Sequence, residues 1–302
     1  MPPRSRYTFG AAIVVSGALA LSFSGLIIRQ VEVADAWQIL FFRSLGMIVT
    51  LTLFLSVTHG RQMVSGFVRS GWRGWSLALL IGPSFGLYIL ALTMASVAEV
   101  SFVVATLPLF TALLAWIFLR EKVRLGTWVA VIVVLLGVSI MVSDSFNEAG
   151  NVLGILAALG VTVTFAITII LIRSGRGIDM IPATWAAGFI GLAISVALTG
   201  GDIGGVPVMD IVWGSLMGVT LGFGFGCYAI GTRHVPAAQV AILVLLEQAL
   251  NPVWAWVGAG ETPTVPILVG GLIIVAAVSY RAVVGVMEEN RAANTNAPVG
   301  DD

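Results

Sequence analysis

The sequence is short of charge. Asp, Glu, Lys and Arg make up 10% of its 302 residues, whereas a soluble globular domain carries about 25% charged residues. Hydrophobic residues make up 58% of the chain, and the mean hydropathy is +1.03. This leaves too few polar residues to cover a core of this size in water. We therefore expect the lipid bilayer to be the solvent for most of the chain.

Chemically reactive residue types are scarce as well. Cys227 is the single cysteine, which excludes an internal disulfide and a multi-cysteine metal site. Lys122 is the single lysine. The sequence holds no Gly-Lys-Ser/Thr phosphate loop, so ATP hydrolysis at such a loop is excluded. The 15 basic residues balance 15 acidic ones without gathering on one face, so nucleic-acid binding is not expected. We expect no cofactor and no metal.

Long apolar runs, by contrast, are abundant. A hydrocarbon core about 30 Å thick needs roughly 20 apolar residues for each helical crossing. The sequence offers segments of this kind at 9–28, 36–58, 74–94, 99–119, 126–142, 153–172, 181–199, 209–231, 237–257 and 264–286. They predict an all-α polytopic membrane protein with ten transmembrane helices. The polar residues 288–302 are interpreted as a disordered cytoplasmic tail.

Basic residues predict how the helices are oriented. If the N-terminus is cytoplasmic, every Lys and Arg in a connection lies on the cytoplasmic side except Arg29, and Arg43 lies within a helix. Such a bias sets topology through the positive-inside rule. We therefore expect a multi-pass protein of a bacterial inner membrane with both termini in the cytoplasm.

The two halves of the chain resemble each other. A shift of 140 residues pairs Gly82 with Gly222, Tyr88 with Tyr228, and Glu121 with Glu261, and a shift of 144 pairs Arg29 with Arg173. We interpret residues 1–146 and 147–287 as two five-helix repeats. Because five is odd, the repeats must have opposite orientations in the membrane. Inverted repeats recur in secondary transporters, where two packings of the halves give inward-open and outward-open states.

The order of several motifs also resembles a known family. The motifs are Phe42–Arg43, Tyr88…Ala91–Leu92…Pro108…Glu121 and Tyr228…Pro252…Gly260–Glu261. In this order they resemble the EamA-type transporters of the drug/metabolite transporter superfamily, over nearly the whole chain to about residue 286. The resemblance implies export of metabolites such as amino acids, aromatic ones included, by alternating access.

Ionisable residues inside the predicted helices are the first candidates for a site, since charge in a membrane usually faces a cavity or a partner. Glu247 lies near the middle of the ninth segment, and helical spacing puts Asn251 and Trp254 on the same face. This face could bind a substrate, and a carboxyl group shielded from water could also carry a proton. Alternatively, Glu247 forms a structural ion pair with Arg43, which would otherwise be a coupling charge.

Further candidates for substrate binding are Tyr88, Tyr228 and Thr106. The two tyrosines occupy equivalent repeat positions and need hydrogen-bond partners, which a ligand or a neighbouring backbone could supply. The Thr106 hydroxyl could instead bond within its own helix. Glycines spaced by four residues at 218, 222 and 226 predict close helix packing. Pro108 and Pro252 predict interrupted helices.

These features predict a secondary transporter whose partners are the lipid bilayer and a small-molecule substrate such as an amino acid, working as a monomer or weak homo-oligomer. A channel would be expected to show rings of polar residues, commonly through oligomeric symmetry. A membrane-embedded enzyme would need converging nucleophile, acid and base, or metal ligands, and the predicted helices hold no such set. We therefore do not expect an enzyme.

Overall fold

The structure is a computed structural model that describes residues 3–60, 71–120, 125–142, 149–174, 180–231, 234–235 and 237–295. Every regular element in these ranges is a helix: α1 (Pro3–Ser22), α2 (Ser24–Ile28), α3 (Ala36–His59), α5 (Gly71–Met94), α6 (Val97–Val104), α7 (Leu107–Leu119), α8 (Leu125–Val142), α9 (Ala149–Ser174), α10 (Met180–Leu198), α11 (Val208–Gly231), α12 (Ala237–Ala259) and α13 (Val265–Thr295). The prediction of an all-α chain is confirmed for this part of the protein.

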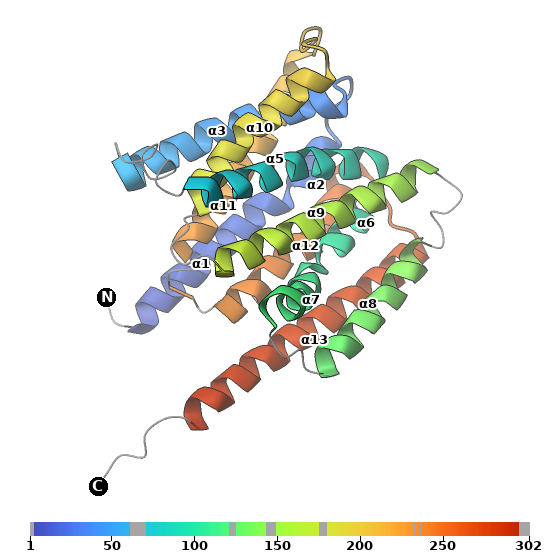
Figure 1. Ribbon diagram of the computed structural model, residues 1–302. Helices are drawn as coiled ribbons and strands as arrows, with labels where there is room; N and C mark the ends of the chain where they lie inside the picture. The colour runs from blue at the N-terminus through green and yellow to red at the C-terminus, as the bar shows by residue number, and fades with distance from the viewer. Residues whose placement is uncertain are drawn as a thin grey trace.

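The helices form a bundle of near-parallel and antiparallel rods (Figure 1). Two rods are broken, the first between α1 and α2 at Phe23 and the second between α6 and α7 at 105–106. Seven stretches within the described ranges are long and apolar enough to cross a membrane, and 125–140 and 265–280 are shorter apolar helices. Large apolar side chains lie exposed on the outside, among them Leu53, Val57 and Leu125. The chain is therefore a polytopic membrane protein whose outer surface suits lipid.

Capping residues explain where two of the helices begin. The Asp35 side chain accepts hydrogen bonds from the backbone N–H groups of Trp37 and Gln38. In return, the Gln38 side-chain oxygen accepts a hydrogen bond from Asp35 N. Ser96 and Glu99 form the same reciprocal arrangement at the start of α6. Each capping box satisfies N–H groups that the first helical turn leaves without partners.

Glycines set the tightest helix contact, between α11 and α3. A Cβ atom added at Gly222 would lie 2.8 Å from Thr50 Cβ, and one at Gly226 would lie 2.9 Å from Phe54 Cδ2. At Gly218 it would run into the backbone of Arg43 and lie 2.7 Å from Met47 N. The prediction that this glycine series marks close helix packing is confirmed.

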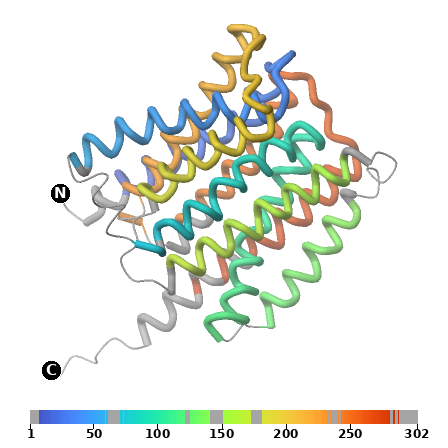
Figure 2. Tube along the Cα trace, turned by 45° about the horizontal axis from the view of Figure 1, so that its top comes forward, coloured from blue at the N-terminus to red at the C-terminus, as the bar shows by residue number. Residues whose placement is uncertain are grey.

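The remaining helices pack in a regular set of pairs. Besides α3, helix α11 contacts α1, while α5 contacts both α9 and α10. Helix α3 also contacts α10, α1 contacts α12, α7 contacts α9, and α8 pairs with α13 along one side of the bundle (Figure 2). Helix α1 begins and α13 ends at the same end of the bundle (Figure 1).

Three details differ from the sequence-based predictions. Helix α13 continues to Thr295, so residues 288–295 are helical rather than part of a disordered tail, and 296–302 lie outside the described residues. Helix α12 runs unbroken through Pro252. The break in the fourth rod falls before Pro108, which lies at the start of α7, where a missing N–H removes no helical hydrogen bond.

Candidate functional site

An acidic side chain lies in the middle of α12, facing α11. Tyr228 Oη donates a hydrogen bond of 2.9 Å to Glu247 Oε2, and Gln248 Nε2 donates one of 3.1 Å to Glu247 Oε1. Glu247 itself is half-buried. No cation pairs with it among the described residues. Two neutral donors thus hold a carboxyl group inside a bundle of apolar helices, an arrangement that can stabilise charge without cancelling it.

The predicted alternative, an ion pair between Glu247 and Arg43, is wrong. Arg43 lies on α3 with only 4% of its surface exposed, and within the described part of the chain its Nε and Nη1 atoms have no hydrogen-bond partner. Its guanidinium carbon lies 5.2 Å from the ring centre of Phe85 and 5.4 Å from that of Tyr88. Two aromatic rings on α5 therefore flank the buried cation where a carboxylate was expected.

Tyr88 lies beside Arg43, with its ring centre 5.4 Å from the guanidinium carbon. Its hydroxyl lies 3.0 Å from Ser24 Oγ, at the start of α2. Ser24 precedes Gly25, whose N–H group donates to Asn251 on α12, so Tyr88 lies close to the helix that carries Glu247. Both tyrosines are half-buried and both have a protein partner in this conformation.

Asn251 and Trp254 connect α12 to the break in the first rod. Asn251 Oδ1 accepts a hydrogen bond of 2.8 Å from Gly25 N, and Asn251 Nδ2 donates one of 3.0 Å to Ser101 Oγ. Trp254 Nε1 donates to Ser22 Oγ at 2.9 Å, and its ring stacks on that of Phe23 at 5.0 Å. These polar groups satisfy backbone and side-chain groups that the helix break leaves free.

Thr106 lies at the second break, between α6 and α7. Its hydroxyl donates a 2.6 Å hydrogen bond to Val103 O and is buried. This bond within its own rod is the second of the two roles that the sequence allowed. Within the described ranges, no group of three or more His, Cys, Asp and Glu residues could hold a metal ion.

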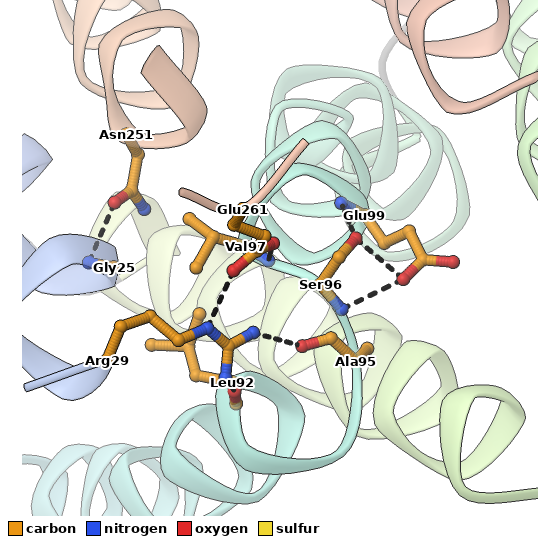
Figure 3. A network of polar contacts seen from close by, with 9 residues as sticks. All are labelled: Gly25, Arg29, Leu92, Ala95, Ser96, Val97, Glu99, Asn251 and Glu261. Carbon is orange, nitrogen blue, oxygen red and sulfur yellow. Dashed lines mark hydrogen bonds and ion pairs between the residues drawn. The ribbon is translucent and has the colours of Figure 1, made fainter. Parts of the chain in front are cut away.

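Sequence reasoning missed a polar network at the end of the bundle opposite the start of α1 and the end of α13 (Figure 3). Arg29 Nε donates a 2.6 Å hydrogen bond to Glu261 Oε2, and Arg29 also donates to Leu92 O and Ala95 O. Glu261 Oε1 accepts a 2.6 Å bond from Val97 N. The network joins the ends of α2, α5 and α12 to the start of α6. In the sequence, Arg29 and Glu261 each have a counterpart in the repeat, and Glu261 also ends one of the family motifs, but nothing there pairs the two residues.

A second missed residue is Asp210, in the first turn of α11. Its carboxylate accepts hydrogen bonds from the backbone N–H groups of Glu32, Val33 and Ala34, at 3.3, 2.8 and 2.8 Å. The side chain is 3% exposed. Asp210 therefore fixes the connection between α2 and α3 against α11.

An all-helical bundle with several apolar helices of membrane-crossing length defines a multi-pass membrane protein. The model of the EamA-like transporter family matches residues 8–143 and 152–280. The chain therefore belongs to the EamA-like transporter family. The predicted family resemblance is confirmed.

Relatives of known name are distant. Solute carrier family 35 member G1 of Mus musculus is 26% identical over 206 residues, which cover 63% of this chain and 54% of that protein. The chain thus spans about half the length of this mouse relative. The pseudopaline exporter CntI of Pseudomonas aeruginosa is 23% identical over 284 residues, covering 89% of this chain and 94% of the exporter. A solved crystal structure at 16% identity has a TM-score of 0.62, covers 89% of this chain and 96% of its own, and shows the same fold.

Proposed function

We propose that this transporter exports small metabolites, with amino acids, including aromatic ones, as the substrate class, across a bacterial inner membrane. In this proposal residues 1–146 and 147–287 are inverted repeats that rock against each other in alternating access. Both termini are cytoplasmic, and the substrate contacts Tyr88, Tyr228 and Glu247. Thr106, Asn251 and Trp254 hold the broken rods beside the substrate.

The pattern of helix contacts supports the repeat. If α1, α3, α5, α7 and α8 correspond to α9, α10, α11, α12 and α13, each contact in the bundle should have a counterpart. The pair α3–α11 corresponds to α10–α5, and α5–α9 corresponds to α11–α1, and all four contacts are present. The pairs α8–α13 and α3–α10 correspond to themselves. Because the contacts of the first half have counterparts in the second half, the two halves can exchange their packing arrangements, as alternating access requires.

Equivalent glycines support it further. Gly82 and Gly222 are matched by the shift of 140 residues. A Cβ atom at Gly82 would lie 2.6 Å from Ile190 Cγ2 on α10, and one at Gly222 would lie 2.8 Å from Thr50 Cβ on α3. Because α10 and α3 are themselves counterparts, matched glycines pack on matched helices.

Glu247 is the observation on which the transport mechanism rests. A carboxyl group in the middle of a membrane helix is costly and marks a functional position by default. Glu247 keeps two neutral donors and no cation among the described residues, so it is available to a proton or to a positively charged substrate group. Exchange of the two on Glu247 would couple export to proton entry. The name of the pseudopaline exporter supports the outward direction.

Transport by purified protein in liposomes tests the proposal. We expect saturable uptake of radiolabelled amino acids from a panel, stimulated by a pH gradient in one direction. Glu247→Gln should fold and lose at least about tenfold of the gradient-driven rate, because the amide cannot carry a proton. Glu32→Gln is the matched control, because it also replaces a carboxylate by an amide, but at an exposed position. Unchanged gradient dependence in Glu247→Gln would contradict the role of Glu247.

A further inference from the structure

Among the described residues, Arg43 is a buried cation that lacks hydrogen-bond partners. Its side chain is 4% exposed, and Nε and Nη1 have no partner within the described part of the chain. Taking a cation out of water is costly unless an anion or good hydrogen-bond acceptors replace the water. The flanking rings of Phe85 and Tyr88 recover only part of this cost by cation–π attraction.

The surroundings of Arg43 keep its side chain from moving to a position where its N–H groups would find hydrogen-bond acceptors. Its backbone lies in the closest contact between α3 and α11, where Gly218 approaches the Arg43 carbonyl. The rings of Phe85 and Tyr88 confine the side chain from α5. Glu247, the acid expected as its partner, is bound to Tyr228 and Gln248 instead. The guanidinium is therefore held in place with free N–H donors.

We propose that Arg43 binds the negatively charged carboxylate of the transported molecule, and that the same molecule presents an ammonium group to Glu247. The guanidinium group offers N–H donors in a planar fork that matches a carboxylate. The Tyr88 ring lies against Arg43, and its hydroxyl bonds to Ser24, which is next to the point where Gly25 meets α12, the helix of Glu247. Tyr88 therefore lies where the middle of such a molecule would pass. A zwitterion would supply a carboxylate to Arg43 and an ammonium group to Glu247, and neither residue has an ion-pair partner among the described residues.

This inference rests on the proposed transport function and assigns one charged residue to each charged end of its substrate. Because Arg43 is buried in this conformation, the carboxylate reaches it in another one, which alternating access provides. Gln248 adds a further group for the ligand, since its Oε1 is a buried acceptor without a partner within the described residues. An acceptor beside Glu247 suits an ammonium group, which has three N–H donors to place.

Counterflow in proteoliposomes tests the assignment, with a matched set of phenylalanine, phenylalanine amide and 3-phenylpropanoate as competitors. The amide lacks the carboxylate, and the propanoate lacks the amine. With wild-type protein, we expect phenylalanine to compete at least about tenfold better than either analogue. Arg43→Gln should remove the preference for phenylalanine over its amide while keeping the preference over the propanoate. Glu247→Gln should do the reverse.

The thermal stability of Arg43→Gln offers a second readout. Since Arg43 has unmet donors, Arg43→Gln should leave the thermal unfolding midpoint without ligand unchanged or higher, whereas a structural arginine would lower it. Arg43→Lys keeps the charge without the fork and should retain part of the preference. Wild-type protein that accepts the amide as well as the amino acid overturns the assignment, whatever the variants do.

The outcomes separate the two proposals. Amino-acid transport with full carboxylate preference in Arg43→Gln overturns the role of Arg43 and leaves the proposed function standing. Folded wild-type protein that transports none of the amino acids overturns the proposed substrate class, and the zwitterion inference with it.

Discussion

The ion pair between Arg29 and Glu261 allows a quantitative prediction. Truncating either residue to alanine removes one charge-assisted hydrogen bond between their side chains, 2.6 Å long. Glu261→Ala also removes the acceptor of Val97 N, and Arg29→Ala leaves two carbonyl groups without a donor. Each single variant should therefore lower the free energy of unfolding by about 1–3 kcal/mol.

The coupling between the two residues is the sharper quantity. Exposed ion pairs contribute about 0.2–1 kcal/mol, and hydrogen bonds to charged groups about 1.5–3 kcal/mol. The two side chains are 28% and 21% exposed, so solvent screens part of the interaction. We expect a coupling free energy of about 1 kcal/mol in a double-mutant cycle, and a smaller value in 1 M salt, where the Debye length falls to about 3 Å.

Unfolding of the purified protein in mixed detergent micelles measures this cycle. The control cycle combines Arg29→Ala with Glu32→Ala, because Glu32 is exposed and no hydrogen bond or ion pair between it and Arg29 occurs among the described contacts. The control should be additive within about 0.5 kcal/mol. A coupling below about 0.3 kcal/mol for Arg29 and Glu261, by comparison with the control, would refute the view that this pair fastens α2 to α12.

Two further predictions concern packing and buried polar groups. Gly218→Ala should strongly destabilise the protein in thermal unfolding, because the added Cβ would meet the backbone of Arg43. In the control Gly126→Ala the added Cβ meets nothing within 4 Å, so this variant should be neutral or slightly stabilising. Equal effects of the two substitutions would contradict the close contact of α3 and α11. Asn251→Ala should lower the free energy of unfolding by about 1–3 kcal/mol because it orphans Gly25 N, and a neutral result would show that water replaces the amide.

Some parts of the site were within reach of the sequence. Glu247 and the pair of tyrosines stood out because polar groups are rare in apolar helices, and the tyrosines also belong to motifs that resemble the EamA-like family. Their partners were not predictable. Tyr228 and Glu247 lie on separate helices, so their 2.9 Å hydrogen bond depends on how α11 and α12 are set against each other.

The same limit explains the ion pair that the sequence left as an alternative, which does not form, and the ion pair that sequence reasoning missed. Arg43 and Glu247 were plausible partners because both are charged and intramembrane, yet the rings of Phe85 and Tyr88 lie against Arg43 instead. Arg29 and Glu261 lie at helix ends, where charge is unremarkable, and only the meeting of α2 and α12 brings them together.

The sequence by itself determined the solvent, the helical class and the approximate bounds of the helices, because hydropathy and helix formation depend on residues close together in the chain. It also determined which helix faces could approach closely, through glycines spaced by four. Tertiary structure alone decided where two rods break and which polar groups are satisfied by protein. It also decided that Arg43 keeps unpartnered donors, because each of these depends on distances between helices far apart in sequence.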